Sequence, residues 1–584
     1  YFEHAYLARY LGFVLVEGGD LTVRDDTVYM RTISGLKRAD VLLRRLDSDF
    51  ADPLEFNPAS RLGVPGLAGA VRQRNVAIAN ALGSGVVEAR AMLGFLPGIA
   101  RRVLGEELLL PNVATWWCGQ TMERDHVIEN FDRMVIAPAL GATLPGILAR
   151  GPVLGSALSP EERSELIHAI GRRGSDYVGQ EVVRLSTTPV WRGEGENAHL
   201  EPRPSILRLY VARSAEGWTV MPGGFCRISD RPDARAVTLQ QGGVSADVWV
   251  LSDRPVAETT LLSSPDSVAL RRTTLTLPSR AGENLFWLGR YLERTEAALR
   301  IVRAIAGRLV EAEGNGSSVM TRLVGTLVAS GAAVAERGPT QPAGLAFAAL
   351  TDRASFNTVP RLAEASRRAA SVIRDRLSPD AWRAVADLET FTQRPLHGRT
   401  GSDMLERANE ALRLIAAFSG LAQENMVRQH GWRFMELGRR IDRGLAIARA
   451  ARMCGFDARP GDLDALLELA DSQITYRIRY VMQAVRVPVL DLVLLDSSNP
   501  RALAFQADRI RRALSELPAH APAGMLAPAD RLASRLFAEL ETGDAATLTT
   551  NAIFAHEQTL MRISDEIALA YFTHRAPPGE ASGD

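Results

Sequence analysis

The chain carries the same set of carboxylate and arginine side chains twice, in two stretches that overlay at an offset of 149 residues. The overlay of 282–303 on 431–452 equates Arg290, Glu293 and Arg294 with Arg439, Asp442 and Arg443. In a helix, residues spaced i, i+3 and i+4 share one face. We therefore predict two helices of one domain that each carry a stripe of arginine and carboxylate.

Such a stripe can serve one of two purposes. Arginine binds oxyanions through two parallel hydrogen bonds, so the stripes could hold a peptide or another charged substrate between packed helices. Alternatively, a carboxylate of one copy receives an arginine of the other, and the pair fixes the register of the two helices. Because the neighbouring positions are apolar, we favour the second interpretation.

The first copy resembles the signature of the Alpha-E family, a helical domain named for a Glu-Arg pair, here Glu293 and Arg294. Further similar stretches are RDRLSPDAWRAV at 374–385, ENMVRQHGWRFMELGRRIDR at 424–443 and VLDLVLLDSSNPRALAFQ at 489–506. The resemblance covers nearly all of 281–584 and implies an all-helical domain.

Residues 1 to about 257 alternate between short extended runs and helical stretches, which is typical of a mixed α/β domain. A hairpin is predicted within 21–32, with its turn at Asp25-Asp26. Further strands are predicted at 41–45, 134–137, 177–185, 205–213, 218–224 and 247–252, and helices at 66–80, 88–104 and 160–172.

From 281 to 575 the pattern is almost entirely helical, and its breaks indicate about eight helices. We assign 258–280 as a linker, with Pro278-Ser279 starting the helical domain, and 576–584 as a flexible tail. At 584 residues the chain is long enough for at least two domains. It begins with Tyr1 instead of methionine, so we expect the true N-terminus upstream.

The α/β part resembles the circularly permuted ATP-grasp family. The similar stretches include LVEGGDLTVRDDTVYMRT at 15–32, ELLLPNVATWWCGQ at 107–120, YVGQEVVRLSTTPVW at 177–191, VMPGGFCRIS at 220–229 and QGGVSADVWVLS at 241–252. The resemblance implies ATP-dependent ligation, in which ATP phosphorylates a carboxylate and an amine then displaces phosphate to form an amide. It also implies Mg²⁺ at the triphosphate, held by carboxylates.

Candidate site residues follow from this resemblance. Glu181 is the candidate Mg²⁺ ligand, and Arg208 and Arg227 are the candidate catalytic clamps on phosphate or acyl phosphate. The other candidate nucleotide contacts are Asn80, Gly83, Gly85, Arg203, Gly223, Gly224 and Asp247. The candidate substrate-binding residues are Asp20, Arg45 and Asp49.

Each candidate also has a structural interpretation. Gly223-Gly224 lies between two predicted strands and could form only a turn. Glu181 could pair with Arg208, and Arg203 and Arg208, which flank an apolar strand, could both be solvated edges. Two positions depart from the family pattern, because Ala137 and Ala246 stand where basic residues that contact ATP phosphates are expected.

Composition excludes several classes of function. With 68 basic and 68 acidic residues and no dense basic run, nucleic acid is not an expected partner. Three distant cysteines argue against a disulfide framework or a zinc site, and a reducing cytoplasm fits them best. No apolar run is long enough to cross a bilayer.

Two functions remain. The first is an ATP-dependent carboxylate–amine ligase for peptide or amino-acid-like substrates, whose helical domain holds the substrate or binds partner proteins. The second is a catalytically degenerate ATP-grasp scaffold that recruits components of a peptide-modification system. Ala137 and Ala246 favour the second, whereas Glu181, Arg208 and Arg227 favour the first, which we prefer.

Overall fold

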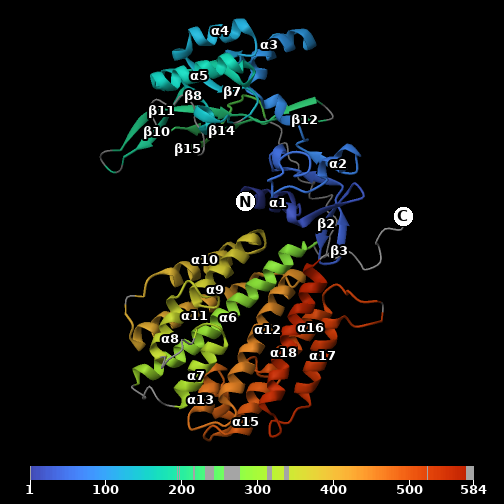
Figure 1. The fold of residues 1–584 in the computed structure, drawn as a ribbon, viewed down its shortest axis with the longest axis vertical. Coiled ribbons are helices and arrows are strands. Elements are labelled where there is room, and N and C mark those ends of the chain that lie inside the picture. Colours follow the sequence, from blue (N-terminus) through green and yellow to red (C-terminus); the bar gives the residue numbers. More distant parts are fainter. Residues whose placement is uncertain are drawn as a thin grey trace. The chain divides into compact units, whose positions relative to one another are not determined.

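The computed structural model describes most of the chain, namely residues 2–141, 143–193, 195, 198–214, 217–229, 243–255, 276–311, 318–334, 341–396, 398–522 and 524–573. The residues form two compact units (Figure 1). One, here the helical unit, joins 1–79 to 272–584, and the other, here the α/β unit, comprises 80–271. The N-terminal α/β region is followed by an all-helical region, as predicted.

The α/β unit contains two four-stranded antiparallel sheets, with strand orders β6-β9-β7-β8 and β10-β11-β14-β15, and a separate hairpin, β12-β13. Its strands are β6 (Thr115–Trp117), β7 (Met134–Pro138), β8 (Val153–Leu154), β9 (Tyr177–Glu181), β10 (Thr187–Arg192), β11 (His199–Arg208), β12 (Val211–Ser214), β13 (Gly217–Val220), β14 (Gly224–Ile228) and β15 (Val244–Val248). Its helices are α3 (Arg90–Leu104), α4 (Thr121–Glu129) and α5 (Pro160–Arg172).

The first of these sheets is covered by a hydrophobic core built around Cys118, Phe131, Ile136 and Ile170, all fully buried. Helix α5 brings Ile170 into this core, and its start is set by local sequence. Ser159 and Glu162 form a capping box, and proline occupies the first helical position.

The helical unit begins with an N-terminal α/β segment. Strands β1 and β2 pair in register from Leu21↔Met30 to Arg24↔Thr27. Asp25 and Asp26 connect them with φ of 48° and 54°, as a two-residue hairpin turn of the favoured twist requires. The elements of this segment are α1 (Phe2–Leu11), β1 (Leu21–Arg24), β2 (Thr27–Thr32), β3 (Gly35–Arg38), β4 (Val41–Leu43), α2 (Leu67–Arg72) and β5 (Ala77–Ala79).

This segment is joined to the helices by buried contacts. Ile33 is 1% exposed and belongs to the same hydrophobic core as the helices. Its backbone N–H donates to the carbonyl of Leu277 at 3.2 Å. Asp20, also 1% exposed, accepts hydrogen bonds of 2.8–3.1 Å from the guanidinium of Arg280. Residues of the N-terminal segment and of the helices thus share one core.

Within the described residues the helical region has thirteen α-helices, more than the eight predicted. They are α6 (Ser279–Val310), α7 (Ser318–Ala329), α8 (Pro342–Thr351), α9 (Val359–Val372), α10 (Pro379–Gln393), α11 (Gly401–Asn425), α12 (His430–Cys454), α13 (Asp462–Leu469), α14 (Gln473–Tyr480), α15 (Arg486–Leu490), α16 (Leu503–Ser515), α17 (Pro528–Glu541) and α18 (Thr550–Ile567).

The helix count was underestimated because several helices end without a glycine-rich break. Helix α10, for example, starts where the Ser378 hydroxyl accepts from the N–H of Ala381, with Pro379 at the first helical position. The long helices α6 and α12 pack on each other at the centre; α9 and α11 pack on α6, and α16 and α18 pack on α12 (Figure 1).

Helix α6 begins at Ser279, as predicted. The predicted linker 258–280 lies outside the described residues up to 275, and so does the predicted tail 576–584. The domain limits of 257 and 281 therefore stay predictions. Among the described helices, none combines the length and the apolar character that a membrane span requires.

Candidate functional site

The α/β unit contains a cleft of about 1010 Å³ that is lined by residues of both of its four-stranded sheets. Trp116 and Met134 line it from the first sheet, and Thr187 and Pro204 line it from the second. Its volume lies at the upper end of the range typical of ligand-binding sites. The cleft is therefore large enough for a nucleotide.

Glu181, the predicted metal ligand, lies in this cleft at the exposed end of β9. Its backbone N–H donates to the carbonyl of Ala114 at 3.0 Å, which fixes the end of the strand. The described residues provide no ion-pair partner for its carboxylate, so the predicted structural pair with Arg208 is not formed. Arg133 and Arg184 also line the cleft, and both are exposed. The carboxylates of Glu181 and Asp132 and two guanidinium groups thus line the same space.

The remaining polar lining comes from α4 and the residues after it. The His126 ring lies 4.6 Å from the ring of Trp116, and the side-chain amide of Asn130 donates to the His126 carbonyl at 2.9 Å. Asp132 pairs with Arg163 at 3.1 Å. These contacts order the wall of the cleft opposite the second sheet.

The lining of the cleft suits Mg²⁺ only if a bound nucleotide supplies further ligands from its phosphates. The described residues contain no cluster of three or more potential metal ligands of the histidine, cysteine, aspartate or glutamate type. Mg²⁺ is, however, commonly held by one or two carboxylates together with substrate phosphates and water. Glu181 meets that requirement without a preformed metal cage.

Arg208, Arg227 and Asp247 share one face of the second sheet. Arg208 and Asp247 both lie opposite Phe225 in the register, and strand alternation places Arg227 on the same side. The Phe225 ring lies 5.3 Å from the Arg208 guanidinium and 5.6 Å from that of Arg227. The Nε of Arg227 is buried and has no hydrogen-bond partner among the described residues.

Neither of these arginines lines the cleft. Pro204, which does, lies four residues before Arg208 on β11, about 13 Å along an extended strand. Arg203 lies on the opposite face of β11 and pairs with Glu201 at 2.7 Å. The structure therefore groups Arg208 with Arg227 and Asp247, and places Glu181 and Arg203 apart from them.

The two predicted glycine segments differ in structure. A Cβ at Gly224 would lie 2.3 Å from the Arg208 carbonyl oxygen, and one at Gly223, where φ is 142°, would lie 2.9 Å from that of Val248. Glycine is therefore required at Gly223 and Gly224 because the backbones of the neighbouring strands β11 and β15 approach them closely. In contrast, Gly83 and Gly85 face open space, which leaves their backbone accessible. Asn80, before them, has a φ of 64°.

The two departures from the family pattern lie in different environments. Ala137 is fully buried and packs with Ala91, Ala139 and Val178. Ala246 is exposed, but strand alternation puts it on the face of β15 opposite Asp247. A basic side chain at position 137 would have to enter a small, closed core.

The three predicted substrate-binding residues belong to the helical unit. Asp20 is buried against Arg280, which leaves little of its carboxylate surface for a substrate. Arg45 pairs with Glu3 at 2.5 Å and keeps 40% of its side chain exposed. Asp49 is exposed.

The repeated stripes lie on α6 and α12, which run parallel and touch through their glycines. A Cβ at Gly289 would lie 2.3 Å from the Met435 carbonyl oxygen, and one at Gly438 would lie 2.0 Å from that of Phe286. Gly289 and Phe286 are equivalent to Gly438 and Met435 at the repeat offset of 149 residues. The two helices thus make the same backbone contact twice, in a reciprocal manner.

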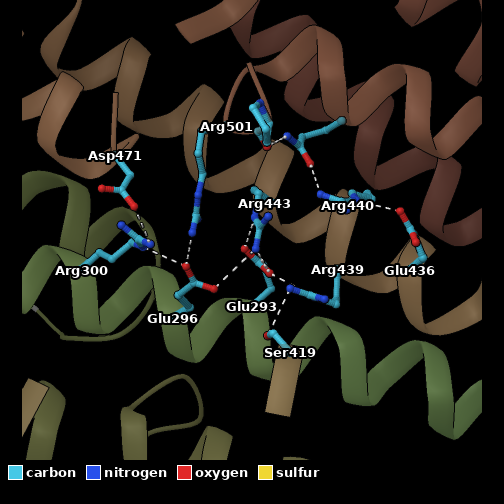
Figure 2. Close-up of polar contacts among 12 residues, drawn as sticks. Glu293, Glu296, Arg300, Ser419, Glu436, Arg439, Arg440, Arg443, Asp471 and Arg501 are labelled. Atoms are coloured by element: carbon cyan, nitrogen blue, oxygen red, sulfur yellow. Dashed lines mark hydrogen bonds and ion pairs between the residues drawn. The ribbon is translucent and has the colours of Figure 1, made fainter. Parts of the chain in front are cut away.

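Reciprocal ion pairs accompany the glycine contact. Arg443 binds Glu293 through both Nε and a terminal amino group, at 2.5 and 2.8 Å. Asp442, the equivalent of Glu293, accepts from the Nε of Arg290 at 2.5 Å and of Arg294 at 2.9 Å. Figure 2 shows Arg443 and Arg439 converging on Glu293. An arginine of each copy thus binds a carboxylate of the other copy, which is the pairing that the favoured interpretation requires.

The ion pairs extend into a larger network around α6 and α12 (Figure 2). Each of five buried carboxylates is bound by at least two arginines. The carboxylates are Glu293, Glu296, Glu436, Asp442 and Glu557, and the arginines are Arg290, Arg294, Arg300, Arg439, Arg440, Arg443, Arg449, Arg452, Arg501 and Arg509. Ten arginines thus surround these five buried carboxylates, and one of them, Arg300, also pairs with the exposed Asp471 at 3.4 Å.

The many arginines of this network change the pKa values of its members. Burial lowers the pKa of Arg440 to about 10. Repulsion from Arg443 and Arg439 also lowers this pKa, whereas the attraction of Glu436 opposes the change. For Glu296, burial alone would raise the pKa, but the guanidinium groups of Arg501, Arg443 and Arg300 outweigh it and lower the pKa.

The lowered pKa of Glu296 predicts a pH-dependent stability. A carboxyl whose pKa is lower in the folded state contributes stability above its unfolded pKa, about 4.3, and loses it as the pH falls toward the folded pKa. We expect the helical unit to lose stability from pH 5 to pH 3, and Glu296→Gln to lose less over that window. Urea unfolding followed by circular dichroism at each pH measures this; equal slopes for the two proteins would contradict it.

Some residues of these sites were not predicted. Arg184 follows Glu181 by three residues inside the similar stretch 177–191, and that proximity was a usable signal. Arg133 and His126 lack such a signal. Gly289 and Gly438 are equivalent in the repeat, so their pairing could have been read as a helix contact.

Comparisons with known proteins agree with this architecture. Residues 1–229 match the family described as circularly permuted ATP-grasp type 2. Residues 277–572 match Alpha-E, described as a predicted alpha-helical domain with a conserved ER motif. The chain thus combines an ATP-grasp region with a helical domain. The chain belongs to the Alpha-E family, and its N-terminal region is similar to circularly permuted ATP-grasp type 2.

Similar proteins occur in several bacteria. The uncharacterized protein Rv2567 of Mycobacterium tuberculosis is 31% identical over 548 residues, which cover 88% of this chain and 60% of that protein. The uncharacterized protein sll0335 of Synechocystis is 40% identical over 251 residues, 43% of this chain and 50% of that protein. The uncharacterized protein Rv2411c of M. tuberculosis is 38% identical over 257 residues, 44% and 45% of the two chains. The chain spans about 60% of the length of Rv2567.

Proposed function

We propose that this protein contributes to an ATP-dependent ligase that joins a carboxylate to an amine, acting on peptide or amino-acid-like substrates. The observation that carries the proposal is the large cleft that places Glu181, Arg133 and Arg184 together between two sheets of an ATP-grasp region. The helical unit would hold a substrate or a partner, and the protein would act in the cytoplasm.

The cleft offers the groups that phosphoryl transfer requires. Mg²⁺, when bound beside Glu181, would neutralise charge on the phosphates. Arg133 and Arg184 lie on the lining, are exposed and would bind phosphate oxygens, to which arginine is suited. The Trp116 and His126 rings both line the cleft and would supply aromatic surface for the base of the nucleotide.

A second function, a degenerate ATP-grasp scaffold, is supported by one specific observation. Ala137 is enclosed by small core residues, so this strand supplies no cation to a nucleotide. In that case the cleft would bind a nucleotide weakly or not at all, and the protein would act by recruiting partners.

A thermal-shift experiment distinguishes the two functions. A ligand that binds the folded state raises its stability, by about 2.7 kcal/mol when its concentration is a hundred times Kd. We expect Mg²⁺-ATP to raise the melting temperature of the α/β unit. Glu181→Gln should weaken the apparent affinity for Mg²⁺-ATP at least tenfold, which corresponds to about 1.4 kcal/mol of binding free energy, and the shift in melting temperature should be smaller.

The matched control is Glu165→Gln, because Glu165 is exposed on α5 and does not line the cleft. This variant should retain the full nucleotide shift. Amine-dependent phosphate release then tests ligation. An unchanged melting temperature for the unmodified protein would favour the scaffold.

A further inference from the structure

The helical unit contains a cavity of about 330 Å³ beside the pair of central helices. Its charged lining residues are Arg290 and Arg294 of α6, with Asp442 and Arg449 of α12. Three guanidinium groups thus face a single carboxylate in a space partly closed to solvent. Such an imbalance attracts an anion, because the surrounding protein screens charge less than water does.

Two of the arginines retain hydrogen-bonding capacity. Asp442 is shared, since Arg290 and Arg294 each direct an Nε at it. Arg290 also donates to the Ser564 hydroxyl at 2.5 Å. Arg294, in contrast, has Asp442 as its one hydrogen-bond partner among the described residues, and 30% of its side chain is exposed. Its two terminal amino groups are therefore available to an oxyanion.

Arg449 is similarly under-neutralised. Its Nε lies 3.5 Å from Glu557, a carboxylate that accepts a shorter bond, 2.8 Å, from Arg452. The side chain of Arg449 is 27% exposed. Arg294 and Arg449 together can bind the two oxygens of one carboxylate or phosphate.

The rest of the cavity lining indicates a ligand that carries apolar and amide groups besides its anionic group. Ala297, Ile301, Leu445 and Met561 supply apolar surface, and Asn357 supplies a side-chain amide that has no hydrogen-bond partner within the described residues. A free phosphate would use the arginines alone. A molecule with a carboxylate next to an amide and short apolar groups would use all three kinds of surface.

We propose that this cavity binds the carboxylate end of an amino acid or short peptide, with Arg294 and Arg449 on the carboxylate and Asn357 on the adjacent amide. The cavity lies wholly in the helical unit, so the proposal stands whether or not the cleft of the α/β unit binds a nucleotide. Calorimetry without nucleotide therefore tests it separately.

The probes are the dipeptides Ala-Ala and Ala-Glu, their C-terminal amides and inorganic phosphate, each titrated into the full chain. We expect a dipeptide to bind with a Kd of about 1 mM or tighter, and its amide at least about tenfold more weakly because the charged acceptor is lost. Arg294→Gln should weaken dipeptide binding at least about tenfold.

Controls keep the test interpretable. Arg294→Gln leaves Asp442 bound by Arg290, and a second variant, Arg449→Gln, leaves Glu557 bound by Arg452, so both should retain the fold by circular dichroism. Arg303→Gln, on α6 but outside the lining, should bind dipeptides normally. Three results would overturn the proposal. They are no dipeptide binding at about 10 mM, dipeptide binding by folded Arg294→Gln and Arg449→Gln that is as tight as that of the unmodified protein, or phosphate binding as tight as that of the dipeptides.

Discussion

Replacing Gly438 by alanine should destabilise the helical unit by at least about 3 kcal/mol, because the new Cβ would lie 2.0 Å from the carbonyl oxygen of Phe286. That oxygen belongs to the backbone of α6 and cannot rotate away as a side chain could. The helices would have to separate, which would also lengthen the bond between Arg443 and Glu293. Calorimetric unfolding of the full chain, with the helical transition followed by circular dichroism, measures the loss.

The control for this prediction lies on α6. A Cβ at Gly307 would meet no atom within 4 Å, so Gly307→Ala adds helix propensity without a clash. It should leave stability unchanged or raise it by up to about 1 kcal/mol. If Gly438→Ala behaved like Gly307→Ala, the close approach of α6 and α12 would be wrong.

Removing the arginine of the reciprocal pair should have a comparably large effect. Arg443→Met would leave Glu293, whose side chain is 4% exposed, with Arg439 at 3.7 Å as its one ion-pair partner in the described part of the chain. Breaking a buried ion pair by removing one partner costs about 3–5 kcal/mol. Urea unfolding of the helical unit should therefore shift to markedly lower denaturant.

Two comparisons identify the cause. Combining Arg443→Met with Glu293→Gln should recover part of the loss, because the uncompensated buried charge is then removed. Arg413→Met, which breaks an exposed pair with Glu410, should leave the transition where it is. A double variant less stable than Arg443→Met alone would show that Glu293 is stabilised by other contacts.

Local features of this fold were predictable because they depend on neighbouring residues. Asp25-Asp26 marked a hairpin since aspartate tolerates the left-handed backbone that this turn requires. Helix α5 could be placed at 160–172, where the structure has it, from its proline and polar start. The pairing of Glu293 with Arg443 was also predictable, since arginine and carboxylate residues recur in the two copies of the repeat at an offset of 149 residues.

Features that depend on distant segments were not predictable. Asp20 and Arg280 are separated by 260 residues, and periodicity does not show that they meet in one buried ion pair. Arg133 joins Glu181 only because β7 and β9 are neighbours in the sheet. Conversely, Arg203 and Arg208 looked equivalent in sequence, but an odd spacing along β11 places them on opposite faces.

Hydrogen–deuterium exchange with and without Mg²⁺-ATP tests most directly whether the cleft of the α/β unit is a nucleotide site. Bound nucleotide should slow exchange of amides at 126–134 and 181–187, the segments that supply His126, Arg133, Glu181 and Arg184 to the lining, while the central helices α6 and α12 exchange as before. Unchanged exchange in both segments at saturating Mg²⁺-ATP would contradict the nucleotide site and the ligase proposed from it.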